Sequence, residues 1–164
     1  MKQFILVIKN RITLCEKVDK QWKKRFEAEC IYGKNGYSKN RREGDMTTPI
    51  GIFKLMYAFG IEENSYAKME YRKITENSYY TLHNKWVESE KQVPGEHLIE
   101  YEREYKYGIA IEFNINPYIK GKGSAIFLHC RGDKDYTSGC IAVEEQVMTY
   151  LLKVIKKNAY IVIR

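Results

Sequence analysis

His129 and Cys140 are the two residues whose types and spacing predict nucleophilic chemistry. They stand eleven positions apart at the ends of a polar segment; one apolar run leads into His129 and another follows Cys140. A histidine near a cysteine can take the thiol proton, and the resulting thiolate is a good nucleophile near neutral pH. The pair therefore predicts a cysteine nucleophile with a histidine base. The same residue types also fit a histidine at a strand end and a cysteine packed in the core.

The residues beside this pair could complete such a site. Gly139 directly precedes Cys140 and allows a tight turn, in which the N–H groups of Ser138, Gly139 and Cys140 could converge on an oxyanion. The base needs a partner on its second ring nitrogen, and the carbonyl of Cys130, next to His129, could accept that hydrogen bond. We therefore expect these five residues to form one catalytic group.

The elements that must position this group are predicted to be short strands. Apolar runs or period-two alternation mark strands near residues 4–8, 11–16, 26–32, 51–57, 107–114, 124–129, 140–143 and 160–163. Residues 61–107 are rich in Tyr, Glu, Asn and Lys. They predict a loop-rich insert over one edge of the sheet, with at most one short helix.

One amphipathic helix is predicted near the C-terminus. Val147, Leu151, Val154 and Ile155 fall on one apolar stripe, and Asn158 can take the left-handed conformation that ends a helix. The predicted fold class is therefore β-rich α+β, with one C-terminal amphipathic helix.

Length and composition limit the class of protein. A chain of 164 residues predicts a single domain over residues 1–164, and 44% apolar with 30% charged residues excludes a disordered tail. No apolar run approaches the ~20 residues of a membrane-spanning helix, and the run at 4–8 is too short for a signal-peptide core. We expect no integral membrane segment, no visible export signal and a monomer.

The net charge of +7 favours anionic surroundings, such as nucleic acid, lipid or a cell-wall polymer. The basic residues are scattered, and no helix-turn-helix, RNP-like or zinc-finger spacing is present. We therefore expect no nucleic-acid partner. An anionic cell-wall polymer stays a candidate partner, and a solvated basic face is the simpler interpretation.

Cys15 and Cys30 are predicted to be structural. A hairpin turning near Asp19 would place Cys15 opposite about Lys24 rather than Cys30, which argues against a cross-strand disulfide. No C-x-x-C pair exists, so a zinc or redox motif is not expected. Cys140 alone is predicted to combine accessibility with a lowered thiol pKa.

Several blocks along the chain share the order of one known family. They are residues 42–53 (REGDMTTPIGIF), 96–98 (EHL), 107–114 (YGIAIEFN), 123–129 (GSAIFLH) and 137–143 (TSGCIAV). Together they resemble the L,D-transpeptidases with a YkuD-like catalytic domain, and the match covers most of residues 4–164.

The resemblance implies a β-sandwich-like catalytic domain that acts on peptidoglycan stem peptides. Cys140 would be the nucleophile and His129 the base, oriented by the Cys130 carbonyl. Cys140 would attack the carbonyl of the third stem residue and expel D-alanine. The thioester would pass to a neighbouring stem, giving a 3→3 cross-link, or to a free D-amino acid. The resemblance also implies a cell-envelope location and no metal or organic cofactor.

Three further residues are expected to bind substrate: His97, Thr137 and Arg131. The sequence departs from the family at Ser138, where a histidine is usual, and at Ala142, where many relatives carry Arg or Asn. Two other functions use the same residues differently. A carboxypeptidase would accept water in place of the amine, and a non-catalytic wall-binding module would not need Cys140.

Overall fold

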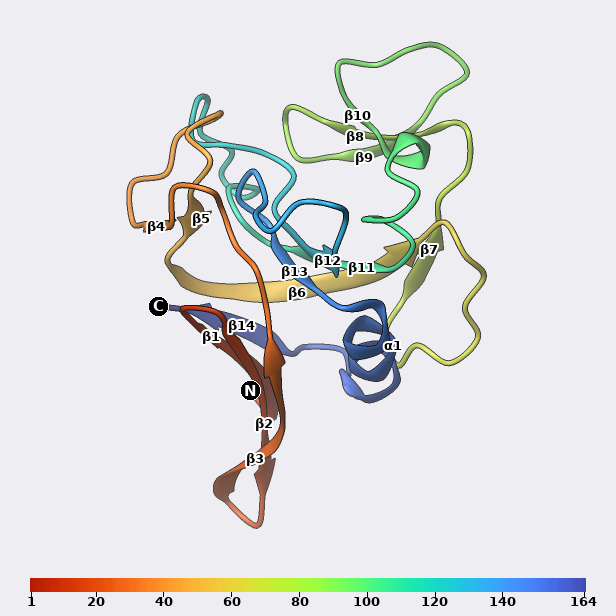
Figure 1. Ribbon diagram of the computed structural model, residues 1–164. Coiled ribbons are helices and arrows are strands. Elements are labelled where there is room, and N and C mark those ends of the chain that lie inside the picture. Colours follow the sequence, from red (N-terminus) through yellow and green to blue (C-terminus); the bar gives the residue numbers. More distant parts are fainter.

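The main element of the fold is a curled sheet of nine strands. The computed structural model describes residues 1–164. The strands of this sheet are β1 (Gln3–Ile8), β2 (Arg11–Val18), β3 (Gln21–Glu29), β6 (Gly51–Gly60), β7 (Tyr71–Lys73), β11 (Gly108–Ile111), β12 (Phe127–Cys130), β13 (Ile141–Val143) and β14 (Tyr160–Ile163). Their order is β13-β12-β11-β6-β14-β1-β2-β3, and β7 pairs in parallel with β6 (Figure 1). The predicted β-rich fold class is confirmed.

The β2–β3 hairpin extends away from the body of the molecule (Figure 1). Its register places Cys15 opposite Lys24, as the position of the turn predicts. Cys15 and Cys30 are both free thiols, and Cys30 is buried. The predicted register of Cys15 against Lys24 is therefore confirmed.

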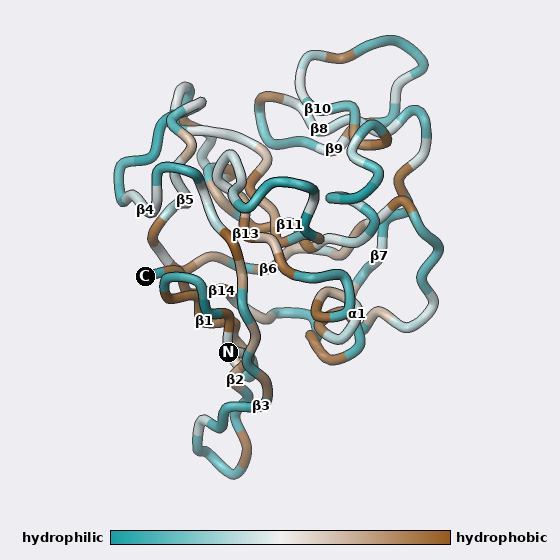
Figure 2. The backbone as a smooth tube through the Cα atoms, in the orientation of Figure 1, coloured by the Kyte–Doolittle hydropathy of each residue, from teal (hydrophilic) through white to brown (hydrophobic).

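The single α-helix, α1 (Glu145–Val154), packs against the main sheet (Figure 1). It buries Met148, Leu151 and Leu152 in a core cluster of 23 residues, whereas the predicted stripe residues Val147 and Val154 lie at its margin. Hydrophobic stretches of the backbone follow β11, β13 and part of α1, and the peripheral loops are mostly hydrophilic (Figure 2). The helix ends before Asn158, whose positive φ serves the turn into β14 instead.

The insert is more ordered than its composition predicts. It contains a three-stranded sheet of order β10-β8-β9, made of β8 (Ser78–Thr81), β9 (Trp86–Glu88) and β10 (Gly95–His97). A short 3-10 helix, Leu98–Glu100, follows. Tyrosine and tryptophan side chains explain the difference, because they supply apolar area that the insert buries. A second core of nine residues joins insert and main sheet, and it includes Tyr80, Leu98, Phe127 and Cys140.

The segment before β6 is paired by isolated β-bridges with the region of the chain around Cys140. It holds β4 (Tyr37–Ser38) and β5 (Thr48–Pro49), which pair in parallel. Isolated bridges join Ile31 to Ala142 and Gly33 to Thr137. Two loops far apart in sequence are thereby fixed side by side. No helix of the structure has the length and apolar character needed to cross a membrane.

Candidate active site

The Cys140 side chain lies at the junction of the main sheet and the insert. Only 9% of the residue is exposed. Its Sγ accepts a hydrogen bond from the Phe127 N–H at 3.3 Å and donates one to the Ala125 carbonyl at 3.2 Å. The thiol is therefore held against the chain that enters β12.

The insert fixes that entering chain. Asn84, 6% exposed, accepts a hydrogen bond from the Ala125 N–H at 2.8 Å and donates to the carbonyls of Asn114 and Gly123. Ala125 has a φ of +53°, a conformation that costs a non-glycine residue about 1–3 kcal/mol. The Asn84 contacts offset this cost and so place the acceptor of the Cys140 thiol.

His129 projects from β12 into the cavity that Cys140 also lines. The cavity holds about 310 Å³. The His129 Nδ1–H donates to the Cys130 carbonyl at 2.7 Å, so the predicted orienting hydrogen bond is present and leaves Nε2 as the basic nitrogen. The Tyr105 ring packs edge-on against the imidazole, with 5.4 Å between ring centroids. The ring is thus fixed in both orientation and tautomer.

The charge state of the pair differs from the sequence-based expectation. Burial raises the pKa of the Cys140 thiol to about 12, with nearby Glu96 acting in the same direction against the Phe127 N–H and Arg41. Burial lowers the pKa of His129, against the Cys130 hydrogen bond and Glu104. No hydrogen bond joins the two side chains. The prediction of a lowered thiol pKa was therefore wrong: both groups are neutral near pH 7, because the closed second core desolvates them.

Thr137 shapes the loop before Cys140. Its Oγ1 donates to the Cys140 carbonyl at 2.6 Å and accepts from the Gly139 N–H at 3.0 Å. The Gly139 N–H is therefore occupied, and the predicted set of three oxyanion donors is reduced. The N–H groups of Ser138 and Cys140 make no hydrogen bond within the protein. These two remain free to hold an oxyanion.

Arg41 is a site residue that sequence reasoning missed. It is 6% exposed; its Nε donates to the Thr47 carbonyl at 2.7 Å and its Nη2 to the Ser138 carbonyl at 3.2 Å. Gly139, at φ +143°, makes room for it, since a Cβ there would lie 2.7 Å from Arg41 Nη2. In the sequence Arg41 is one of several scattered basic residues, and nothing local marks it as buried.

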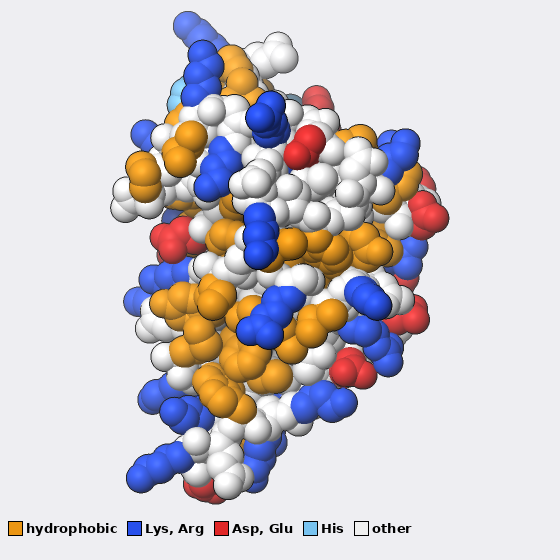
Figure 3. All heavy atoms as spheres, turned by 90° about the vertical axis from the view of Figure 1, so that its left-hand side faces the viewer, with side chains coloured by type: hydrophobic (Ala, Val, Ile, Leu, Met, Phe, Trp, Pro, Cys, Tyr) orange, Lys and Arg blue, Asp and Glu red, His pale blue; other side chains and the backbone are white.

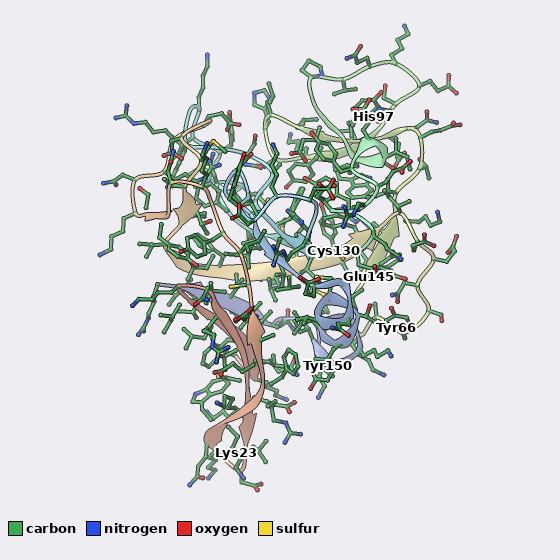
Figure 4. The ribbon with its side chains drawn as sticks, viewed as in Figure 1. Lys23, Tyr66, His97, Cys130, Glu145 and Tyr150 are labelled. Carbon is green, nitrogen blue, oxygen red and sulfur yellow. The ribbon has the colours of Figure 1, made fainter.

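His97 does not reach the cavity. It stacks on Tyr79 at 4.4 Å, and its Nε2 bonds to the Glu76 carbonyl at 2.6 Å. Figure 4 shows His97 on the insert and Cys130 at the end of β12. The prediction that His97 contacts substrate was therefore wrong. Neighbouring residues of a strand face opposite sides, and in β10 it is Glu96 that lines the cavity. Glu96 lies within the block of residues 96–98 that resembles the family, but the sequence pattern was interpreted as pointing to His97.

Of the other two predicted substrate contacts, Arg131 lies away from the cavity and Thr137 lines it. Arg131 pairs with Glu144 at 3.4 Å and lines a separate hollow beside the Cys130 side chain. Thr137 does line the Cys140 cavity, but its hydroxyl is engaged by the two backbone groups of its own loop. No three His, Cys, Asp or Glu side chains gather as metal ligands do.

Cys15 should react with an alkylating reagent before Cys140. Cys15 is partly exposed, whereas Cys140 is 9% exposed and a thiol pKa of about 12 leaves about one thiolate in 10⁴ molecules at pH 8. A short iodoacetamide pulse followed by peptide mass spectrometry measures the order, with Cys15→Ser as control. Labelling of Cys140 ahead of Cys15 would show that the thiolate–imidazolium pair forms in the free protein.

Comparisons with known proteins identify the family. The family model described as the L,D-transpeptidase catalytic domain, YkuD, matches residues 2–163. Comparison with curated protein sequences gives no match.

Solved structures share the fold at low identity. Bd1075 of Bdellovibrio bacteriovorus is 18% identical with a TM-score of 0.59, over 99% of this chain and 48% of that one. The helical cell shape determining protein Pgp2 of Campylobacter jejuni is 18% identical with a TM-score of 0.59, over 99% and 47%. The L,D-transpeptidase of Enterococcus faecium, as its C442S mutant, is 15% identical with a TM-score of 0.52, over 100% and 50%.

This chain spans about half the length of these structures. The curled sheet, the single helix and the family match over residues 2–163 agree with one another. The chain therefore belongs to the YkuD family of L,D-transpeptidase catalytic domains.

Proposed function

We propose that this chain is a cysteine-dependent L,D-transpeptidase that acts on peptidoglycan stem peptides through a thioester. The observation that carries the proposal is the shared cavity of Cys140 and His129, next to two unoccupied N–H groups. Nucleophile, base and oxyanion donors are the three parts that acyl transfer needs.

The first half of the reaction forms the thioester. As Cys140 Sγ attacks the carbonyl carbon of the third stem residue, its proton passes to His129 Nε2. The carbonyl oxygen becomes an oxyanion, held by the N–H groups of Ser138 and Cys140. When this intermediate collapses, the amide bond breaks, and His129 gives its proton to the leaving D-alanine nitrogen. Because both groups begin neutral, this proton transfer accompanies the attack rather than preceding it.

The second half transfers the acyl group to an amine. The amine of a neighbouring stem attacks the thioester carbon, His129 accepts a proton from it, and Cys140 Sγ leaves as the thiol. The product is a 3→3 cross-link. A free D-amino acid would replace the terminal residue by the same steps. We expect residues 1–164 to act as one catalytic domain and as a monomer, at the cell envelope where stem peptides occur.

The Lys and Arg side chains on one face of the molecule are spread among hydrophobic patches and a few acidic groups (Figure 3). The view shows no continuous basic groove on this face. On this face the distribution agrees with the solvated-surface interpretation of the +7 charge.

Tetrapeptide muropeptides incubated with the protein should yield a cross-linked dimer. Its mass should equal two substrate molecules less one alanine, as measured by liquid chromatography and mass spectrometry, and Cys140→Ala should give none. A product shortened by one alanine, with no dimer, would instead show a carboxypeptidase. Unchanged substrate with folded protein would favour the wall-binding module.

A further inference from the structure

Two hollows meet at Cys140. The first, of about 310 Å³, contains His129; the second, of about 250 Å³, contains Arg41, Glu43 and Ser124. Only Glu96, Ser138 and Cys140 line both. Ser138 and Cys140 belong to the nucleophile loop. Glu96 is therefore the one residue of the insert that faces both hollows at the nucleophile.

Glu96 is a carboxylate without a cationic partner. Its Oε2 accepts a hydrogen bond from the Tyr105 hydroxyl at 2.5 Å, and its Oε1 has no hydrogen-bond partner within the protein. It forms no ion pair with any Lys or Arg. Arg41, which lines the second hollow, uses its guanidinium on the Thr47 and Ser138 carbonyls.

The surroundings of Glu96 disfavour its negatively charged form. The groups that interact electrostatically with it are Tyr80, Tyr101, Tyr105, Glu43 and Cys140. The two hollows also contain the titratable groups Glu104, His129, Asp133, Lys134, Tyr136 and Arg41. Lys134 lies over the Tyr136 ring at 5.5 Å and Arg41 bonds to backbone carbonyls, so neither cation pairs with the Glu96 carboxylate. Burial raises the pKa of Glu96 to about 7, with Glu43 acting in the same direction against the Tyr105 hydrogen bond. A half-buried carboxylate in such surroundings is destabilised, and a cation from outside the chain would stabilise it.

We propose that Glu96 binds the ammonium group of the acceptor and removes its first proton before it attacks the thioester. This inference rests on the proposed function. The ammonium must come close to the carbonyl carbon attached to Cys140 Sγ, and Glu96 is the carboxylate that lines both hollows with that sulfur.

The proton balance of aminolysis requires a second base. An acceptor R–NH₃⁺ becomes an amide N–H and so loses two protons. Glu96 takes the first, which converts the ammonium to a nucleophilic amine. His129 takes the second as the C–N bond forms, and passes it to Cys140 Sγ as the C–S bond breaks. Glu96 then returns its proton to water. Hydrolysis needs only one proton removed from water before the C–S bond breaks, so it does not need Glu96.

Glu96→Gln should therefore lower the ratio of transfer to hydrolysis by roughly tenfold or more at neutral pH. The assay follows the thioester formed from a tetrapeptide donor with a diamine or second stem as acceptor, and reads both products by mass. Thioester formation should be unchanged or faster, because the negative charge that opposes the Cys140 thiolate is gone. Glu96→Asp should restore part of the ratio, and Glu100→Gln, outside the cavity, should not change it.

Hydroxylamine separates the role in proton removal from a role in packing. It is largely uncharged at neutral pH, so Glu96→Gln should transfer to it as well as the wild type does. An unchanged ratio with an amine acceptor in Glu96→Gln, with thioester formation intact, overturns the proposal. So does an equal loss with hydroxylamine. Absence of any thioester in the wild type overturns the proposed function instead.

If Glu96→Gln does not fold, a second variant, Tyr105→Phe, tests the role of Glu96 as base. Tyr105→Phe removes the hydrogen bond that lowers the Glu96 pKa. The pH at which the transfer-to-hydrolysis ratio rises should move upward from about 7, because Glu96 would hold its proton to higher pH. A ratio whose pH dependence does not move would contradict a role for Glu96 as base.

Discussion

A carbapenem incubated with the protein is expected to add once per chain, at Cys140. A thiol beside two free N–H groups should open a strained lactam, because those donors stabilise the oxyanion formed on attack. Slow loss of the acyl group would then trap the thioester. Intact-mass spectrometry measures the adduct, and the modified peptide should contain Cys140.

The cysteine variants give this experiment matched controls. Cys140→Ala should remove the adduct completely and lower transpeptidation by roughly 10³-fold or more, whereas Cys15→Ala and Cys30→Ala should keep both. Because burial holds the thiol pKa at about 12 and Ser138 replaces the usual histidine, we expect slow acylation. A folded protein without an adduct would favour the wall-binding module. An adduct lost within minutes would favour the hydrolase, since water would then reach the thioester.

His129→Gln should lower the rate of thioester formation by roughly 10²-fold or more, because it removes the base. His129 is only 6% exposed, so its replacement must still satisfy the buried Cys130 carbonyl. Glutamine can donate a side-chain N–H to that carbonyl, and we therefore expect the variant to fold. Rates under saturating donor, together with circular dichroism of the variant, measure the two effects separately.

The pH profile gives a second readout for His129. A base works in its neutral form, and burial lowers the His129 pKa below its ordinary value of 6.5. The wild-type rate should therefore hold to below pH 6.5 and fall as the imidazole gains its proton, and His129→Gln should lack this fall. If the variant unfolds while its remaining folded fraction keeps full specific activity, His129 is structural.

Local pattern determined much of the fold. The apolar run at 4–8 marked β1, the period-two alternation in β2 follows from its buried face, and the turn at Asp19 placed Cys15 opposite Lys24. The C-terminal helix was visible because its apolar residues recur at helical spacing. The boundaries were less well predicted. For example, β11 stops at Ile111, where its register against β6 shifts, although the apolar pattern continues to Phe113.

The sequence by itself also indicated which residues are candidates for the chemistry. Cys140, Gly139 and His129 stand out by type and order, and the Cys130 carbonyl is next to the base by covalent connection alone. The family signature adds the substrate class as an expectation. All of these inferences depend on residues near one another in the chain.

The tertiary structure alone decided the electrostatics and the walls of the site. Arg41 reaches Ser138 across 97 positions, Asn84 reaches Ala125 across 41, and the insert brings Glu96 rather than His97 to the nucleophile. Burial depends on what the whole chain packs around a group, and so does the pKa that burial shifts. That is why Cys140, predicted from its neighbours to be a ready thiolate, is instead a neutral thiol enclosed between the main sheet and the insert.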